Sequence, residues 1–465
     1  MSESAPVNPV AWRIILLRRN ASEFLVSETE SGLFLPTVEI PVDRRTAQAL
    51  NAEIKALWHL AVYSLYPIEL IDTGPTIRYH VVEALQHDAQ APQSARWVSA
   101  GDASRLCFAE SSDFAAVQMW SERITRKEAN TSHPPFDKPG WFFAVKDFVQ
   151  DSIQNIPLRL TGQFLQSNAS PSFSLIRFET DGDAIWFKAV GEPNTREFPL
   201  TVFVSSKLPA FSPRVLATQP LWNAWVMLEI AGKPLAETEN LSAWRNAARD
   251  LARMQIASIE MIDGILRSEL RDVRTTALLG QVEPFFALMR EWMDRQTKTT
   301  PTRLSLSEIE QLECDTRDGL LALQQERIPD TLGHLDLNPE NVMTVNGGTV
   351  FLDWAEGCIG HPFLSFAHVL EYFLRTFGNN NRGKSTLIHA YLDVWEPLRF
   401  EAPETTLSTS LFLAIFAHAV STDLWRDSRR MLEPATAGYY RSLARRMKRY
   451  RDQVRDDVSS VSKTF

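Results

Sequence analysis

The segment from Gly333 to Trp354, GHLDLNPENVMTVNGGTVFLDW, restricts the fold more than any other part of the chain. Two short runs, NVMTV and TVFLDW, flank the sequence NGG, and this pattern is typical of a β-hairpin. An antiparallel hairpin would return Asn341, at its start, and Asp353, at its end, to the same edge. His334 and Asp336 directly precede it. We therefore expect two carboxylates, an amide and a histidine to meet at one end of a small hairpin.

These residue types suit the transfer of a phosphoryl group. Mg²⁺ prefers oxygen ligands, which Asn341 and Asp353 can supply, and it neutralises charge on the phosphates. An attacking hydroxyl needs a group that accepts its proton, and Asp336 is placed for this role. We expect His334 to hold the loop by hydrogen bonds. Taken singly, Asp336 and Asn341 would more often be cap or turn residues, but their occurrence together beside a hairpin favours the catalytic interpretation.

Composition narrows the class of protein. At roughly 100–200 residues per domain, a chain of 465 residues predicts about two to four folding units. A net charge of −9 does not favour nucleic acid or an anionic membrane as a partner. The cysteines Cys107, Cys314 and Cys358 lie far apart, which argues against a disulfide framework or a zinc site. The longest apolar run, LFLAIFAHAV, is too short to span a bilayer and predicts a buried helix. With no recognisable signal peptide, we expect a cytoplasmic protein.

The order of predicted elements suggests three parts. Residues 1–150 mix strands with a helix predicted over 44–66, and contain a proline-rich candidate linker, Arg126 to Trp141, followed by a short helix around FFAVKDFVQDSIQNI. Residues 151–235 predict five antiparallel strands and one helix, with a DG hairpin turn. Residues 236–465 predict helices around the small hairpin. The basic segment RSLARRMKRYRDQVRDD predicts the solvated face of a last helix.

At this point the sequence resembles a known family. GHLDLNPENVM and LDW are similar to the catalytic loop and the metal-binding segment of the aminoglycoside phosphotransferases, which have a protein-kinase-like fold. The resemblance covers Leu158 to Phe373 well and the C-terminal helices loosely. It implies an α+β, bilobal fold with a five-stranded antiparallel N-lobe and a mainly helical C-lobe. It also implies an ATP- and Mg²⁺-dependent kinase that acts on a hydroxyl of a small molecule.

The same resemblance implies further site residues. Lys188 would hold the α- and β-phosphates of ATP and pair with Glu197, and the backbone around Glu229 would meet adenine. Two features depart from the family pattern. The expected phosphate loop, QSNASPS, has no glycine, and Ser365 stands where many relatives carry an aspartate. Glu356 and His361 are candidate substrate-side residues, although a loop position explains both equally well.

The first 150 residues resemble a Nudix fold in their order of strands. A Nudix helix needs several carboxylates to hold magnesium, whereas the corresponding helix here, AQALNAEIKALWHL, carries only Glu53. We therefore expect a Nudix-like, non-catalytic domain that serves substrate capture, dimerisation or regulation. Two alternatives to the kinase stay open: a pseudokinase-like nucleotide-binding module, favoured by the glycine-free loop, and a Nudix-type hydrolase.

Overall fold

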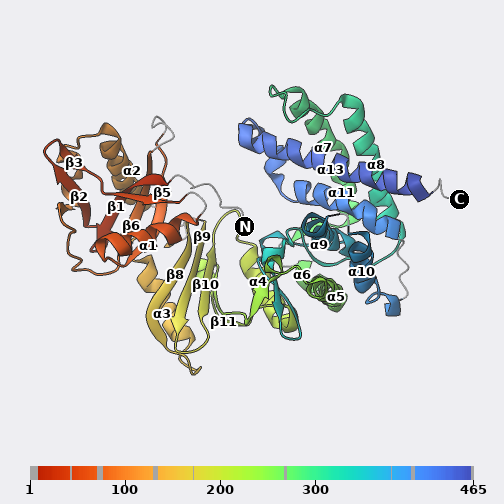
Figure 1. Cartoon of the computed structure of the whole chain (residues 1–465), viewed down its shortest axis with the longest axis horizontal. Helices are drawn as coiled ribbons and strands as arrows, with labels where there is room; N and C mark the ends of the chain where they lie inside the picture. Colours follow the sequence, from red (N-terminus) through yellow and green to blue (C-terminus); the bar gives the residue numbers. More distant parts are fainter. Residues whose placement is uncertain are drawn as a thin grey trace. The chain divides into compact units, whose positions relative to one another are not determined.

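The computed structural model describes residues 9–41, 44–70, 77–128, 135–170, 172–266, 270–378, 380–398 and 404–461. The chain divides into two compact units, each described separately below (Figure 1). Unit 1 consists of Met1–Phe198 and Val215–Glu229, and unit 2 of Pro199–Arg214 and Ile230–Phe465. The predicted boundaries at residues 150 and 235 stay predictions.

Unit 1 begins with a seven-stranded mixed sheet. Its strands are β1 (Val10–Arg18), β2 (Glu23–Thr29), β3 (Gly32–Phe34), β4 (Thr37–Ile40), β5 (Val62–Ile68), β6 (Ile77–Ala84) and β7 (Ala95–Ser99). The main path runs β3-β2-β1-β6-β5, while β4 pairs with β1 and β7 pairs with β2. Strands β1 and β2 form a hairpin, with Leu17 opposite Phe24. The Nudix-like character of this region stays a prediction.

The helices of this region are α1 (Thr46–Trp58), α2 (Ser111–Glu128) and α3 (Trp141–Ser152). The prediction of one helix over 44–66 was wrong in its second half. The helix ends at Trp58, and His59 follows in the left-handed conformation, with φ 56°. The next residues form β5, because pairing with β6 buries them on both faces. Of the predicted linker, residues 129–134 lie outside the described part of the chain.

A second sheet of unit 1 follows. Its five strands are β8 (Leu160–Ser170), β9 (Phe173–Thr180), β10 (Ile185–Val190), β11 (Val215–Gln219) and β12 (Ala224–Leu228). They run antiparallel, as predicted, and the structure places them in the order β11-β12-β10-β9-β8. Helix α4 (Glu197–Lys207) connects β10 to β11.

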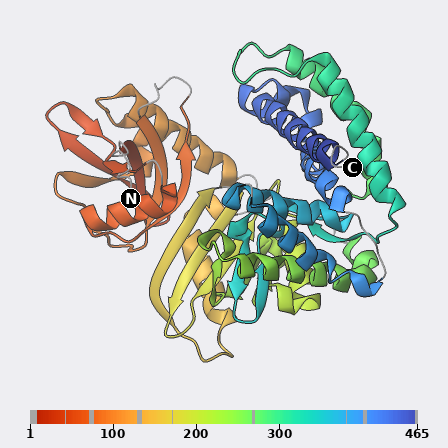
Figure 2. The same ribbon diagram turned by 45° about the vertical axis from the view of Figure 1, so that its right-hand side comes forward.

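Helix α3 lies against one face of the five-stranded sheet (Figure 2). Its contact with the sheet is made by aromatic side chains. The Trp141 ring lies 5.9 Å from that of Phe187, and Phe142 stacks on Phe178 at 6.1 Å between ring centroids. Side chains of both sheets belong to one hydrophobic core. The first 150 residues and the five-stranded sheet are therefore one packed body.

Unit 2 is mainly helical and encloses two small sheets. Its helices are α5 (Leu241–Ser258), α6 (Ile262–Leu266), α7 (Thr275–Asp294), α8 (Leu306–Gln325), α9 (Pro362–Phe377), α10 (Asn381–Leu392), α11 (Glu404–Val420), α12 (Ser428–Met431) and α13 (Pro434–Val461). One sheet contains β13 (Gly232–Pro234), β16 (Val342–Val345) and β17 (Gly348–Phe351). The other contains β14 (Arg271–Val273), β18 (Gly357–Gly360) and β15 (Thr331–His334).

Helix α11 carries the predicted buried run, and its residues from Leu411 to Ala417 are all buried. Among the described residues, no helix is both long and apolar enough to cross a membrane. Leu200 and Val204 of α4, and Leu208 just after the helix, also belong to the core of this unit.

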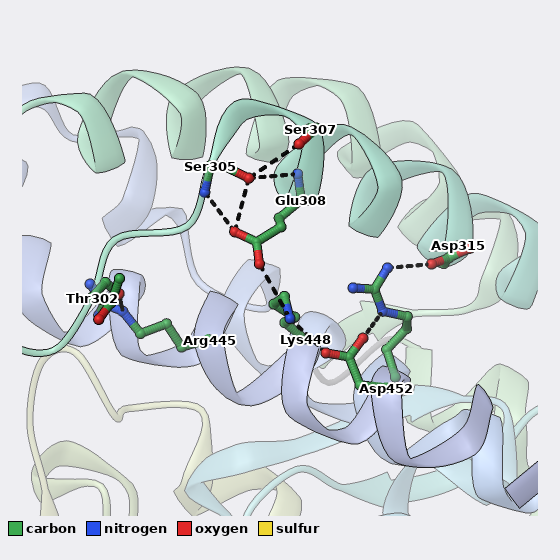
Figure 3. Close-up of polar contacts among 9 residues, drawn as sticks. Thr302, Ser305, Ser307, Glu308, Asp315, Arg445, Lys448 and Asp452 are labelled. Atoms are coloured by element: carbon green, nitrogen blue, oxygen red, sulfur yellow. Dashed lines mark hydrogen bonds and ion pairs between the residues drawn. The ribbon is translucent and has the colours of Figure 1, made fainter. Parts of the chain in front are cut away.

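Helices α8 and α13 are joined by a network of polar contacts (Figure 3). Ser305 and Glu308 form a capping box at the start of α8, and Glu308 also lies 3.3 Å from the Lys448 ammonium. Arg451 of α13 is buried and lies 2.9 Å from Asp315. The prediction that the basic residues of the last helix lie in solvent was therefore wrong in part, because α8 supplies acidic partners.

Replacement of the capping serine tests this helix end. Ser305→Ala should lower the free energy of unfolding by about 1 kcal/mol, since the N3 backbone N–H loses its acceptor. Ser307→Ala, in the same turn, removes a hydroxyl without a capping role and should cost less than half as much. Chemical denaturation measures both, and equal effects would contradict the assignment of the cap.

Candidate active site

The ring of His334 ties two loops together. Its Nδ1 accepts a hydrogen bond from the backbone N–H of Asp336 at 3.1 Å. Nε2 therefore carries the ring proton and donates to the carbonyl oxygens of Asp353, at 2.8 Å, and Leu352, at 3.1 Å. Burial lowers the pKa of His334, which keeps the ring neutral. His334 thus holds the loop by hydrogen bonds, as the sequence predicts.

The loop after His334 presents Asp336 and Asn341. The Asn338 amide lies 3.3 Å from Oδ2 of Asp336, and its oxygen caps the turn Pro339–Asn341 through the Glu340 N–H. Asn341 donates from Nδ2 to the carbonyl oxygen of Asp336 at 3.1 Å. This bond fixes the amide orientation, so the side-chain oxygen is the atom of Asn341 suited to a cation.

The predicted hairpin brings Asp353 back beside Asn341. Strands β16 and β17 pair from Val342 opposite Phe351 to Val345 opposite Gly348. Beyond the last pair, the Leu352 N–H donates to the carbonyl oxygen of Asn341 at 2.9 Å. The structure therefore brings Asp336, Asn341 and Asp353 together, as the spacing predicts.

Asp353 adopts a strained backbone conformation. Its φ of 59° and ψ of 61° lie in the left-handed region, which costs a residue with a side chain roughly 1–3 kcal/mol. Strain of this kind persists where neighbouring contacts enforce it, and the bond from His334 to the Asp353 carbonyl is one such contact.

Asn341 and Asp353 fit a magnesium site shared with a nucleotide. Mg²⁺ is commonly held by one or two protein groups together with phosphate oxygens and water. Among the described residues, no group of three or more His, Cys, Asp or Glu side chains could hold a metal ion by itself. A cation at this hairpin would therefore need further oxygen ligands, from phosphate groups or water, to complete its coordination.

Residues outside the motif bind the backbone of β15, the strand that leads into the loop. The Ser365 hydroxyl accepts a hydrogen bond from the backbone N–H of His334 at 2.8 Å, and Ser258 accepts one from Leu332 at 2.9 Å. The Ser365 oxygen thus supplies an acceptor for the loop backbone. A Cβ atom on Gly333 would lie 2.6 Å from that oxygen and 2.9 Å from the Cys358 sulfur. Sequence reasoning missed Gly333 and Ser258, which carry no motif signal of their own.

Glu356 and Arg271 form an ion pair near the catalytic loop. Arg271 Nη2 lies 2.9 Å from Glu356 Oε1, and the Glu356 carbonyl accepts a bond from the Leu335 N–H at 3.0 Å. Burial raises the pKa of Glu356, and the negative charges of Asp336 and Asp353 add to this effect. Sequence reasoning named Glu356 but missed Arg271, because a lone arginine in a short strand carries no motif.

The other substrate-side candidate, His361, is a helix cap. Its Nδ1 accepts a bond from the Phe363 N–H at 3.4 Å at the start of α9. Burial lowers the pKa of His361 to about 3, so the ring is neutral. The loop interpretation of His361 therefore explains its position.

In unit 1 the structure places Lys188 beside Glu197. The Lys188 ammonium on β10 lies 2.5 Å from Glu197 Oε1 at the start of α4, and both side chains are buried. Glu229, expected near adenine, uses its carboxylate within the five-stranded sheet. It binds Arg177 at 2.6 Å and accepts a bond from the Trp186 indole at 3.2 Å. Its backbone N–H donates to the Ala184 carbonyl at 2.9 Å.

A pair of glycine substitutions tests the packing below the loop. Gly333→Ala should lower the free energy of unfolding by about 1–3 kcal/mol, because the added methyl group displaces the Ser365 hydroxyl from its bond to His334. Gly280→Ala, in α7, meets open space and should instead raise it by about 0.5–1 kcal/mol. Thermal and chemical denaturation measure both. A stabilising effect at both positions would contradict the close packing at Gly333.

Comparison with known proteins identifies one part of the chain. Residues 196–400 match the model of the phosphotransferase enzyme family. A search of curated proteins gave no match.

Among solved structures, one similar chain is the macrolide 2′-phosphotransferase from Brachybacterium faecium, with a TM-score of 0.44, 13% identity, and coverage of 64% of this chain and 97% of that chain. Choline kinase from Cryptosporidium parvum gives a TM-score of 0.47 at 12% identity, over 67% of this chain and 97% of that chain. A putative aminoglycoside phosphotransferase from Ralstonia eutropha gives a TM-score of 0.46 at 14% identity, with coverage of 67% of this chain and 98% of that chain. The family match, which includes Asp336, Asn341 and Asp353, shows that residues 196–400 carry a phosphotransferase-family domain.

Proposed function

We propose that the protein is a kinase that transfers the γ-phosphoryl group of ATP to a hydroxyl of a small molecule and requires Mg²⁺. The observation that carries this proposal is the neutral His334 ring, which binds the backbone of Asp336 and the backbone of Asp353 at the same time. The match of residues 196–400 to the phosphotransferase enzyme family supports the reaction class.

In the proposed mechanism Asp336 orients the acceptor hydroxyl and takes its proton. The amide oxygen of Asn341 and the carboxylate of Asp353 would hold Mg²⁺, which would supply positive charge to neutralise the phosphates. A positioned general base contributes roughly 10²–10⁴-fold to the rate, so the carboxylate of Asp336 is the most sensitive single group.

Residues of unit 1 are proposed to bind the nucleotide. Lys188 steadies the α- and β-phosphates, and Glu197 holds the ammonium in place. At Glu229 the carboxylate and the N–H already have partners in the sheet. The backbone carbonyl oxygen of Glu229 is therefore the group we assign to the adenine amino group.

The proposal extends to the organisation of the chain. Residues 151–235 would be the N-lobe of a bilobal kinase-like fold, and residues 236–465 the C-lobe. Residues 1–150 would be non-catalytic. The partners would be ATP and a small hydroxylated molecule, in the cytoplasm, with no role for nucleic acid or a membrane.

Phosphate transfer by the purified protein tests the proposal. The assay follows the γ-phosphate of ATP, with Mg²⁺, over amino sugars, choline-like alcohols and homoserine. Asp336→Asn should lower turnover of the accepted compound by about 10²–10⁴-fold without a change in the unfolding midpoint. Asp318→Asn, an exposed change of the same kind on α8, should leave turnover unchanged. Unchanged turnover in Asp336→Asn would contradict the mechanism.

The nucleotide-binding module is the second candidate function, and the glycine-free loop favours it. It predicts ATP binding without transfer to any acceptor. Pyrophosphate cleavage that survives the Asp336→Asn change would instead indicate a Nudix-type hydrolase.

A further inference from the structure

The hairpin of β8 and β9 carries the loop that we expect to face the nucleotide phosphates. Its residues Ser170 and Ser172 are close, and the Ser172 N–H donates to the Ser170 hydroxyl at 3.3 Å. Glycine-rich phosphate loops wrap the ligand with a permissive backbone. The sequence from Gln166 to Ser172 has no glycine. The position of its backbone therefore depends on the contacts that fix strands β8 and β9 on either side of it.

The β9 strand is held at Ser174, directly after the loop. Its side chain is buried, and its hydroxyl lies 3.1 Å from that of Tyr63 on β5. The indole N–H of Trp141, the first residue of α3, donates to the same oxygen at 3.4 Å. Both partners come from the first 150 residues, and Tyr63 and Trp141 are themselves buried.

The β8 strand is held at Gln166, the first residue of the QSNASPS segment. Its side-chain oxygen accepts a bond from the Ser64 N–H at 2.8 Å, and its nitrogen donates to the Ser64 carbonyl at 2.7 Å. The Gln166 amide therefore pairs with β5 as a strand backbone would. Asn51 of α1 donates to the same oxygen at 2.8 Å and accepts a bond from the Ser64 hydroxyl at 2.8 Å.

Irregular strand pairing makes this contact possible. The register of β5 against β6 shifts between Ser64 and Tyr66, and the register of β8 against β9 shifts between Gln166 and Asn168. A shift of this kind leaves a residue outside the ladder of the sheet. Ser64 and Gln166 sit at these two irregularities and bind each other, and both are fully buried.

The held segment is adjacent to Lys188. In the β9–β10 ladder Leu175 lies opposite Lys188, and Ser174 lies opposite Ala189. The Phe173 ring centroid is 5.2 Å from the Lys188 ammonium. A shift of β9 at Ser174 would therefore move groups that touch the proposed phosphate-binding lysine.

We propose that the first 150 residues position the nucleotide-binding loop, with Tyr63 and Gln166 as positioning residues at the two strands that carry it. A buried polar group that loses its partner costs roughly 1–3 kcal/mol, so the four bonds of Gln166 and the two of Ser174 favour one placement of the hairpin. The inference rests on the proposed function, because it assigns a nucleotide to this loop.

Two tyrosine substitutions form a matched test. Tyr63→Phe removes only the hydroxyl that reaches Ser174. Tyr79→Phe, on the neighbouring strand β6, also removes a buried hydroxyl, one that donates to Asp113 of α2 at 3.0 Å. Tyr63→Phe should weaken binding of a non-hydrolysable ATP analogue with Mg²⁺ by about fivefold, and Tyr79→Phe by less than twofold. Calorimetry gives the affinities, and amide exchange at Phe173 to Leu175 should rise only in Tyr63→Phe.

A double substitution separates coupling from general loss of stability. Ser174→Ala should weaken the analogue by a similar factor, and Tyr63→Phe with Ser174→Ala by little more than either alone, because both remove one contact. Equal affinity in wild type and Tyr63→Phe, or equal weakening by Tyr63→Phe and Tyr79→Phe, would overturn the inference and leave the kinase proposal intact. A wild-type protein that binds no nucleotide would overturn both.

Discussion

The candidate active site depends on one neutral, buried imidazole ring. His334 accepts from the backbone of Asp336 and donates to the carbonyl of Asp353, so one ring sets the distance between the proposed base and the proposed metal ligand. A protonated ring would have to donate at both nitrogens, and Nδ1 faces an N–H that also donates. The lowered pKa of His334 is therefore consistent with its structural role. Asp353 has a left-handed backbone conformation, and the hydrogen bond from His334 Nε2 to its carbonyl oxygen helps to hold that conformation.

The organisation of unit 1 gives the N-terminal region a physical role. The two sheets share a core, and α3 lies on the five-stranded sheet rather than on the first one alone. Buried amide and hydroxyl bonds then connect β5 and α1 to both strands of the loop hairpin. A domain joined only by a flexible linker would not bury the Gln166 amide against the backbone of β5. This packing fits a region that supports nucleotide binding.

Local signals were sufficient for the centre of the site. The NGG turn, the two short runs that flank it and the spacing of Asp336, Asn341 and Asp353 predicted the hairpin that the structure contains and that brings these residues together. The five antiparallel strands were also readable, because short turns join most of them. These elements depend on contacts between residues close in sequence, which a single sequence records directly.

Contacts between distant residues could not be predicted. The second half of the helix expected over 44–66 is a strand, because pairing with β6 decides between two structures that the apolar run allows. Arg451 meets Asp315 from 136 positions away, so the basic helix appeared to face solvent. Strand β13 pairs with the hairpin strand β16, which is another contact between residues far apart in the sequence. The hydrogen bonds of Ser258 and Ser365 to the loop, and the close packing at Gly333, are also contacts between residues far apart in the sequence.

The most direct test of the account is the effect of Mg²⁺ on ATP affinity in wild type and in Asp353→Asn, measured by calorimetry. The account predicts that Mg²⁺ tightens ATP binding in wild type and that Asp353→Asn loses this gain while it still binds metal-free ATP. An equal gain in both proteins, or no gain in wild type, would contradict the assignment of Asp353 as a metal ligand and with it the proposed phosphoryl-transfer site.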